Sequence, residues 1–226
     1  MRVAVLIPAL DEAASLPGVL ADLPDVWRCI VVDNGSTDGT ARIAERCGAE
    51  VVREPQRGYG RAVRAGIDYL RPEPPEILVI LDADHADAPN TLPALIEPIR
   101  QGDADLVQID RSRTAEPRAL TAVQRLGNGL ATSLIRLVTG HAYADMGPFR
   151  AIRWEALEAL DMGDPTWGWN VEMQMKAVHH GLIIVEIPLP YRRRLRGRSK
   201  ISGTMTGAVR AGYRILLAVH RYRRIP

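Results

Sequence analysis

The sequence predicts one α/β domain built on a doubly wound, mostly parallel sheet that is flanked by helices. Short apolar runs alternate with segments of helical periodicity over the first 110 residues, a rhythm that favours a parallel sheet with right-handed crossovers. The run at 77–81, Ile-Leu-Val-Ile-Leu, contains no polar residue, which is typical of a strand buried on both faces. The 226 residues, 46% of them hydrophobic, are enough for one large domain with a full core.

The individual elements follow from these patterns. We expect strands at 3–8, 29–32, 49–53, 77–81 and 105–109, separated by helices at 13–23, 40–47, 58–70 and 90–101. The rhythm then changes, and we expect helices at 120–139, 154–160, 171–180 and 203–223, with strands at 149–152 and 182–187. No repeat or linker interrupts the chain. We therefore expect a single domain over 1–226, with a nucleotide-binding half at 1–110, an acceptor half at 111–200 and a basic C-terminal helix at 201–226.

Charge is distributed unevenly. Of the 29 Lys and Arg residues, eleven lie at or after Arg192, where there is no Asp or Glu. Such a basic end favours an anionic partner such as phosphate or a membrane surface. A nucleic-acid partner is not expected, because no recognised binding module or interleaved aromatic residues accompany the charge. No apolar run approaches the roughly 20 residues that cross a bilayer. Together with Cys29 and Cys47, interpreted as buried thiols of a reducing compartment, this predicts a cytoplasmic protein, free or peripheral at the cytoplasmic face of a membrane.

Two carboxylates, Asp82 and Asp84, directly follow the apolar run at 77–81. Open α/β sheets bind ligands at the carboxyl ends of their strands. Two neighbouring carboxylates repel each other unless a cation lies between them, and a hard divalent ion that also binds substrate phosphates suits them. The alternative is a strand that ends in a solvated Asp-x-Asp turn.

Polar residues also follow the first two strands. We expect Pro8 to end the first strand, which leaves Asp11 and Glu12 at the start of a helix, either as a polar wall for a nucleoside or as complements to the helix dipole. Asp33 lies in the segment that follows the second strand and could accept a hydrogen bond from a pyrimidine, whereas Ser36, Thr37 and Asp38 are explained by helix capping.

The glycine-rich segment Gly58-Tyr-Gly60-Arg-Ala62 is not a dinucleotide fingerprint, because the third glycine is displaced. Its small residues would let a base or ribose approach the backbone.

Together, Ile-Pro-Ala-Leu-Asp-Glu at 7–12, Val-Val-Asp-Asn-Gly-Ser-Thr-Asp-Gly-Thr at 31–40, Gly-Tyr-Gly-Arg-Ala at 58–62 and Leu-Asp-Ala-Asp at 81–84 resemble family 2 glycosyltransferases with the GT-A fold. Within these, the chain is most similar to the dolichyl- or polyprenyl-phosphate mannosyl- and glucosyltransferases. The resemblance implies a nucleotide-sugar donor, Mg²⁺ or Mn²⁺, and inversion at the anomeric carbon. It implies that nucleotide-sugar contacts come from Pro8, Ala9, Asp11, Glu12, Asp33, Gly35, Gly58, Gly60, Ala62, Asp82 and Ala83.

The resemblance also implies that Asp82 and Asp84 hold the metal that bridges the diphosphate. The chain departs from the family at two positions: Asp11 replaces the usual Asn, and Ala86 stands where polyprenyl-phosphate enzymes often have Gln. A third protein ligand would then come from His85 or Asp87, or a water molecule takes its place.

The second half carries three further resemblances. Asp145-Met-Gly-Pro-Phe-Arg150 is similar to the family segment beside the donor sugar and acceptor, and Glu172 matches the acidic residue that faces the acceptor. Asp145, Glu172 and Asp84 are thus the catalytic candidates, although Glu172 also suits the dipole of its helix. The loop containing Arg194, Arg198, Ser199 and Lys200 resembles the Arg-x-x-Gly-x-Ser-Lys loop of prenyl-phosphate enzymes, and with Arg150 it would bind phosphate.

The expected reaction is the transfer of a sugar from a nucleoside diphosphate to a polyprenyl or dolichyl phosphate. A phosphate acceptor is already ionised near neutral pH, so it needs no strong base. A soluble hydroxyl acceptor would need one, and Glu172 is then the first candidate. The same motifs leave open a nucleotidyltransferase or an inactive nucleotide-sugar-binding protein. The basic final helix either lies on an anionic membrane or packs against the sheet, and a membrane partner protein could also recruit the enzyme.

Overall fold

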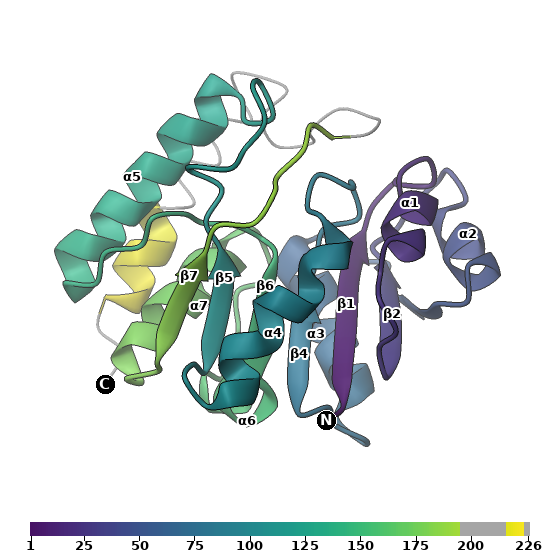
Figure 1. Ribbon diagram of the computed structural model, residues 1–226, viewed down its shortest axis with the longest axis horizontal. Coiled ribbons are helices and arrows are strands. Elements are labelled where there is room, and N and C mark those ends of the chain that lie inside the picture. Colours follow the sequence, from purple (N-terminus) through teal and green to yellow (C-terminus); the bar gives the residue numbers. More distant parts are fainter. Residues whose placement is uncertain (195–215, 224–226) are drawn as a thin grey trace.

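The computed structural model describes residues 1–194 and 216–223 (Figure 1). Within them, one sheet contains seven strands in the order β3-β2-β1-β4-β6-β5-β7. β6 is antiparallel to β4 and β5, and the other neighbouring strands are parallel. The strands are β1 (Val3–Ala9), β2 (Arg28–Asp33), β3 (Glu50–Arg53), β4 (Ile77–Ile80), β5 (Leu106–Ile109), β6 (Arg150–Arg153) and β7 (Ile184–Ile187). The predicted doubly wound, mostly parallel sheet is confirmed.

Helices cover both faces of the sheet because residues along the strands alternate between two apolar clusters. Val5 and Ile7 of β1 pack with residues of α1, α2 and α4. Leu6, on the opposite face, packs with residues of α3, α6 and α7. A third cluster joins α5 and α7 to residues 216–222, which are helical. The helices are α1 (Leu16–Ala21), α2 (Thr40–Arg46), α3 (Tyr59–Leu70), the 3₁₀ turn η1 (Pro89–Thr91), α4 (Leu92–Gln101), α5 (Ala122–Thr139), α6 (Trp154–Ala159) and α7 (Gly168–His179).

The expectation that Pro8 ends the first strand is wrong, since β1 continues to Ala9 and pairs there with Asp33 of β2. Pairing of β1 with β4 stops earlier, at Leu6. The carbonyl oxygen of Leu6 accepts a hydrogen bond from Leu81, so the backbone polar groups of Leu6 point toward β4. Along β1 the backbone polar groups of successive residues point alternately toward β4 and toward β2. The missing N–H of Pro8 therefore points to the side where no ladder remains, so the proline costs no hydrogen bond.

The remaining expected elements agree with the structure except near their ends. α1 begins at Leu16, later than expected, with Pro17 in its first turn, where proline is tolerated. Much of the expected helix at 203–223 lies outside the described residues. Among the residues that are described, no helix is long and apolar enough to cross a membrane. The parallel strands β1, β2, β4 and β5 end at one edge of the sheet (Figure 1). Asp33 ends β2, and the loops that follow β1 and β4 carry Asp11 and Asp82.

Candidate active site

Asp82 and Asp84 lie in the turn after β4, at the carboxyl edge of the sheet. Asp84 is buried, and its Oδ1 accepts a hydrogen bond of 2.9 Å from the backbone N–H of Ala86. Burial, and next the charge of Asp84, raise the pKa of Asp82 to about 7. The two carboxylates are therefore close enough to disfavour joint ionisation, which is the electrostatic setting that a bound cation relieves.

Arg194, at the end of the described stretch 1–194, joins this pair. Its Nη2 lies 2.9 Å from Oδ2 of Asp84, and its Nη1 lies 2.7 Å from Oε1 of Glu12. Glu12 Oε2 in turn accepts a hydrogen bond of 2.7 Å from the Ser15 hydroxyl. One guanidinium thus links the loop after β1 to the loop after β4, and a phosphate-binding candidate meets the metal candidates.

The sequence left His85, Asp87 or a water molecule as the third metal ligand. The His85 ring lies against Gly18, and its Nε2 is 2.9 Å from Asp22, so His85 is directed to α1 and away from the expected metal position. Both carboxyl oxygens of Asp87 are buried and have no hydrogen-bond partner among the described residues. Burial, followed by the charges of Asp82 and Asp84, raises the pKa of Asp87 well above its usual value.

The described residues contain no group of three or more His, Cys, Asp or Glu side chains that could hold a metal ion. Within the described part of the chain, the protein's ligands to such an ion would then be Asp82 and Asp84. Mg²⁺ is commonly bound in this way, through one or two carboxylates, with substrate phosphates and water completing the octahedron. The donor set fits such an ion.

The loops after β1 and β2 carry residues that the sequence predicts to contact the nucleotide. Asp11 Oδ1 accepts a hydrogen bond of 2.7 Å from the N–H of Thr37, and the N–H of Asp11 donates to the Ser36 hydroxyl. Asp33 Oδ1 accepts a bond of 3.2 Å from the N–H of Ser36. The two bonds of Asp11 fix the loops to each other, whereas the bond to Asp33 lies within the turn after β2. Asp33 remains partly exposed at the end of β2. Gly35, in the same turn, has a φ of 76°, which favours glycine.

The small residues of the third motif have a different role from the one expected. A Cβ atom on Gly60 would lie 1.8 Å from the carbonyl oxygen of Asp164, and one on Gly58 would lie 2.3 Å from that of Pro165. Ala62 is 1% exposed and belongs to the core, which leaves it no surface for a nucleotide. The motif is small because the loop at 164–165 approaches it closely, and the expectation of a base or ribose against Ala62 is corrected.

Asp145 is held by Arg111, which follows β5. Arg111 Nε and Nη2 lie 2.6 and 2.9 Å from the two carboxylate oxygens, and its backbone N–H donates a bond of 2.9 Å. Burial alone would raise the pKa of Asp145, but the hydrogen bonds and charge of Arg111 outweigh it, so the pKa is lowered. Asp145 therefore remains ionised and paired, which suits a positioning role better than proton transfer. Sequence reasoning missed Arg111, although its place after a buried strand was the available signal.

Arg150 is fully buried, in contrast to the expected phosphate contact. Its guanidinium donates to the carbonyl groups of Gly147 and Pro148. Burial lowers its pKa, while the nearby Tyr59, Tyr143 and Asp82 act in the opposite direction. Arg150 thus lies behind the surface, where its charge favours an ionised Asp82, and it does not reach an incoming phosphate directly.

Glu172 is also withdrawn from the surface, being 1% exposed. Its carboxylate accepts hydrogen bonds of 2.9 and 2.7 Å from the N–H groups of Gly163 and Asp164, and Lys176 Nζ lies 2.9 Å away. These three donors satisfy the carboxylate and anchor the loop that packs on Gly58 and Gly60. The candidates Arg198, Ser199 and Lys200 lie outside the described residues.

Comparison with known proteins decides the family. A family profile described as glycosyl transferase family 2 matches residues 4–161. The chain belongs to glycosyl transferase family 2. The enzyme is 39% identical over 207 residues to an uncharacterized glycosyltransferase of Mycobacterium tuberculosis, covering 92% of this chain and 93% of the relative. It is 33% identical over 221 residues to the undecaprenyl-phosphate mannosyltransferase of Micrococcus luteus, with coverages of 92% and 90%.

The glycosyltransferase also has relatives among solved structures. Glucosyl-3-phosphoglycerate synthase from Mycobacterium tuberculosis, in complex with Mn²⁺, UDP and glucosyl-3-phosphoglycerate, superposes with a TM-score of 0.79. The superposition covers 100% of this chain and 81% of the synthase, at 21% sequence identity. At that identity the likeness establishes the fold alone, and the fold is GT-A.

Proposed function

We propose that this glycosyltransferase is a metal-dependent, inverting enzyme that transfers a hexose from a nucleoside-diphosphate sugar to a polyprenyl or dolichyl phosphate. The observation that carries the proposal is the meeting of Asp82 and Asp84 with Arg194. Paired carboxylates suit a metal-bound diphosphate, and a guanidinium suits a phosphate. Relatives named undecaprenyl-phosphate mannosyltransferase and dolichyl-phosphate hexose transferase, 33% and 31% identical, support the lipid acceptor.

Asp82 and Asp84 would hold the divalent ion, and neither His85 nor Asp87 is needed as a ligand. When bound, Mg²⁺ or Mn²⁺ supplies Lewis-acid stabilisation to the departing nucleoside diphosphate. Asp33 and Gly35, in the turn after β2, would contact the nucleoside, with Asp11 fixing the neighbouring loop. Structures of glucosyl-3-phosphoglycerate synthase with Mn²⁺ or Mg²⁺ and UDP agree with this choice of ion.

The chain's own residues would act by binding and orientation. Arg194 moves from Asp84 toward phosphate oxygens, where its charge stabilises negative charge that develops during one in-line displacement. Arg111 holds Asp145 ionised at the start of the segment 145–150. This pairing would keep that segment, which is expected to line the acceptor site, in a fixed position. An ionised phosphate needs no proton removed, and this agrees with the full set of donors around Glu172.

A soluble phosphorylated acceptor is the second candidate. Phosphoglyceric acid is bound in structures of glucosyl-3-phosphoglycerate synthase, and the same charges would receive it. In glucosyl-3-phosphoglycerate the phosphate is retained, so the nucleophile of such an acceptor would be a hydroxyl group. That nucleophile is less well served, because Glu172, the expected base, is buried and already hydrogen-bonded. With a lipid acceptor, the enzyme would work at the cytoplasmic face of a membrane.

The proposal can be tested in two stages. Nucleotide sugars are first screened by thermal shift with and without Mn²⁺, because a ligand that binds the folded state raises apparent stability. The selected donor is then incubated with a short-chain polyprenyl phosphate or with phosphoglyceric acid, and transfer is measured. Asp84→Asn should keep the fold and lose transfer, with Asp103→Asn, on an exposed turn, as the control.

Metal-dependent transfer to the prenyl phosphate is the expected result. Transfer only to phosphoglyceric acid would replace the lipid acceptor with a soluble one. The absence of a shift with any donor would point to an inactive nucleotide-sugar-binding protein, and full activity of Asp84→Asn would overturn the metal assignment.

A further inference from the structure

Helix α5 exposes an apolar stripe. Val123, Leu126, Leu130 and Leu137 are 38%, 76%, 39% and 81% exposed. Their spacing of three, four and seven residues places them on one side of a helix. Of the 18 residues of α5, Ala131 and Ile135 alone are buried. The helix therefore rests on the domain along one edge and presents a second apolar face to the surroundings.

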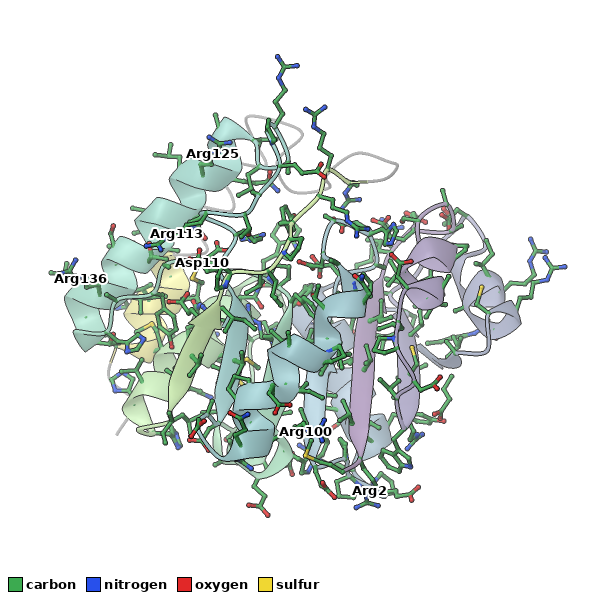
Figure 2. All side chains as sticks on the ribbon, viewed as in Figure 1. Arg2, Arg100, Asp110, Arg113, Arg125 and Arg136 are labelled. Carbon is green, nitrogen blue, oxygen red and sulfur yellow. The ribbon has the colours of Figure 1, made fainter. Side chains whose placement is uncertain are left out.

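The charge around this stripe has one sign. From residue 117 to residue 144 there is no Asp or Glu. Arg118, Arg125 and Arg136 are exposed in the same stretch, and Arg125 and Arg136 lie near the two ends of α5 (Figure 2). An exposed leucine stripe whose charged neighbours are all arginine is typical of helices that lie in the interface of an anionic bilayer.

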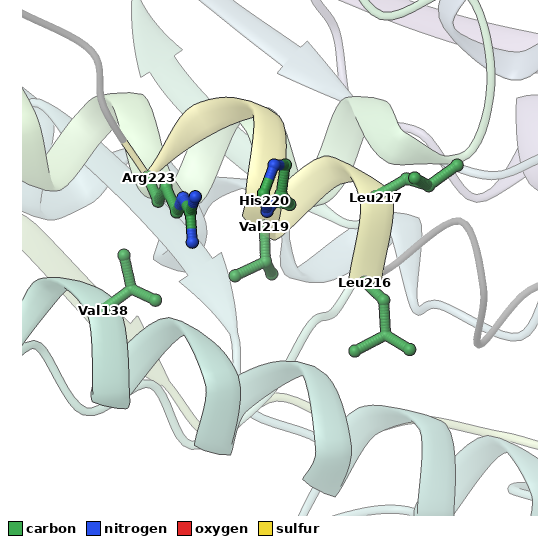
Figure 3. A pocket seen from close by; sticks show the side chains of 6 residues that line it. All are labelled: Val138, Leu216, Leu217, Val219, His220 and Arg223. Carbon is green, nitrogen blue, oxygen red and sulfur yellow. The ribbon is translucent and has the colours of Figure 1, made fainter.

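The described part of the C-terminal helix continues this surface. Leu216 and Leu217 are 49% and 48% exposed, and His220, Arg221 and Arg223 are also exposed. An open groove of about 510 Å³ separates this helix from Val138 of α5 (Figure 3). Its lining is mainly apolar, with His220 and Arg223 as the polar members. Two adjacent helices thus offer leucine and cationic side chains together.

We propose that α5 and residues 216–223 form a docking surface for an anionic lipid bilayer. A second copy of the chain is a poorer occupant, because a symmetric contact through α5 would bring the arginines of the two copies close to one another with no acidic residue between them. A bilayer accepts the leucines into its interface and neutralises the arginines with lipid phosphates.

The surface is placed to serve the candidate site. α5 follows the loop that leaves β5 at the carboxyl edge of the sheet, so one end of the helix lies at the edge that carries Asp82 and Asp84 (Figure 1). A protein docked through α5 would hold this edge near the lipid head groups. The inference deepens the proposed function, since it rests on a lipid-phosphate acceptor for its purpose, but its test needs no transfer reaction.

The test is flotation of the full chain with vesicles. One set contains equal parts of phosphatidylcholine and phosphatidylglycerol, and the other contains phosphatidylcholine alone. We expect the protein to float with the anionic vesicles and to be released by raised salt. The variant Leu126→Gln/Leu137→Gln should lower the partition coefficient by about tenfold or more, because it removes two large apolar side chains from the interface. Ile183→Gln, at a residue 54% exposed in the segment just before β7, is the matched control and should bind as the parent does.

Failure of the parent to float, or equal flotation of the double-leucine variant, would overturn the docking surface. So would light scattering that showed a dimer converted to a monomer by the leucine substitutions, since the stripe would then join two copies. Transfer to a short-chain, water-soluble prenyl phosphate separates the two proposals. Flotation without such transfer would contradict the acceptor assignment alone, and transfer without flotation would contradict the docking surface alone.

Discussion

Arg194 and Asp84 form an ion pair of 2.9 Å at the carboxyl edge of the sheet. The pair joins the second carboxylate of the metal-binding candidate to the first arginine of the predicted phosphate-binding loop. A guanidinium and a divalent ion cannot both neutralise Asp84 at full strength, so the two cations compete in the absence of a nucleotide.

This competition leads to the first prediction. Arg194→Gln should tighten binding of Mn²⁺ to the nucleotide-free protein by about twofold to fivefold, the range expected for a partly exposed ion pair. The same variant should lower kcat/KM for transfer by at least about tenfold, because charge that stabilises the transition state is lost. Free Mn²⁺ measured by electron paramagnetic resonance gives the affinity. Arg192→Gln is the control, since Arg192 pairs with Asp22 at 3.6 Å; equal Mn²⁺ affinity in both variants would contradict the competition.

The raised pKa of Asp82 gives a second prediction, for pH. The folded protein binds more protons at this carboxyl than the unfolded chain does, because the pKa rises from 3.8 to about 7. The contribution of Asp82 to the free energy of unfolding therefore falls as pH rises from about 4 to about 7. Asp82→Asn should make this part of the stability profile less steep, as measured by urea unfolding at a series of pH values.

Binding of Mn²⁺ should show the opposite pH trend. A carboxylate must lose its proton before it can coordinate, so affinity should increase up to about pH 7 and then level off, with release of a proton on binding. Calorimetry in two buffers of different ionisation enthalpy measures that proton. Affinity that is constant between about pH 5 and pH 8 would count against Asp82 as a ligand.

The buried pair of Asp145 and Arg111 gives a third prediction. Asp145→Asn leaves the Arg111 charge without its partner in a site where the two side chains are 2% and 10% exposed. The free energy of unfolding should fall by about 3 kcal/mol. The lowered pKa of Asp145 means that its stabilisation is present above about pH 4 and is lost as the pH falls through the folded-state value. In Glu158→Gln, which alters an exposed pair with Arg71, the change should stay within about 0.5 kcal/mol; similar losses in both variants would refute a structural role for Asp145.

Sequence patterns were sufficient for the sheet and for the acidic end of β4. A wholly apolar strand must lie inside a parallel sheet, so Asp82 and Asp84, which follow it, must lie at the carboxyl edge. Asp33 was placed at the same edge because it also comes directly after an apolar run. The course of β1 through Pro8 was missed because it depends on where β4 stops pairing, which is a property of two strands together.

Contacts between distant loops could not be read from the chain. Gly58 and Gly60 are small because the loop at 164–165 lies on them, more than 100 positions away in the sequence. The pairing of Arg111 with Asp145 also joins segments that no local pattern connects. His85 was assigned to a metal by its position next to Asp84, but its backbone, with a φ of 61°, turns the ring toward Asp22.

Glu172 provides the last prediction, because its position separates a structural role from a catalytic one. Glu172→Gln should cost about 2 kcal/mol of stability, since an amide cannot accept from Gly163, Asp164 and Lys176 together. Lys176 also donates a hydrogen bond to the carbonyl of Asp161, so Lys176→Met has a cost of its own, and the single and double variants together measure the coupling between Glu172 and Lys176. If Glu172 acts only through the loop at 163–164, kcat per folded molecule should fall by less than about tenfold, whereas removal of a general base would cost about 100-fold or more. Because a phosphate acceptor needs no base, a large loss of kcat at full stability would favour a hydroxyl acceptor, and a loss of stability with nearly unchanged kcat would support the phosphate.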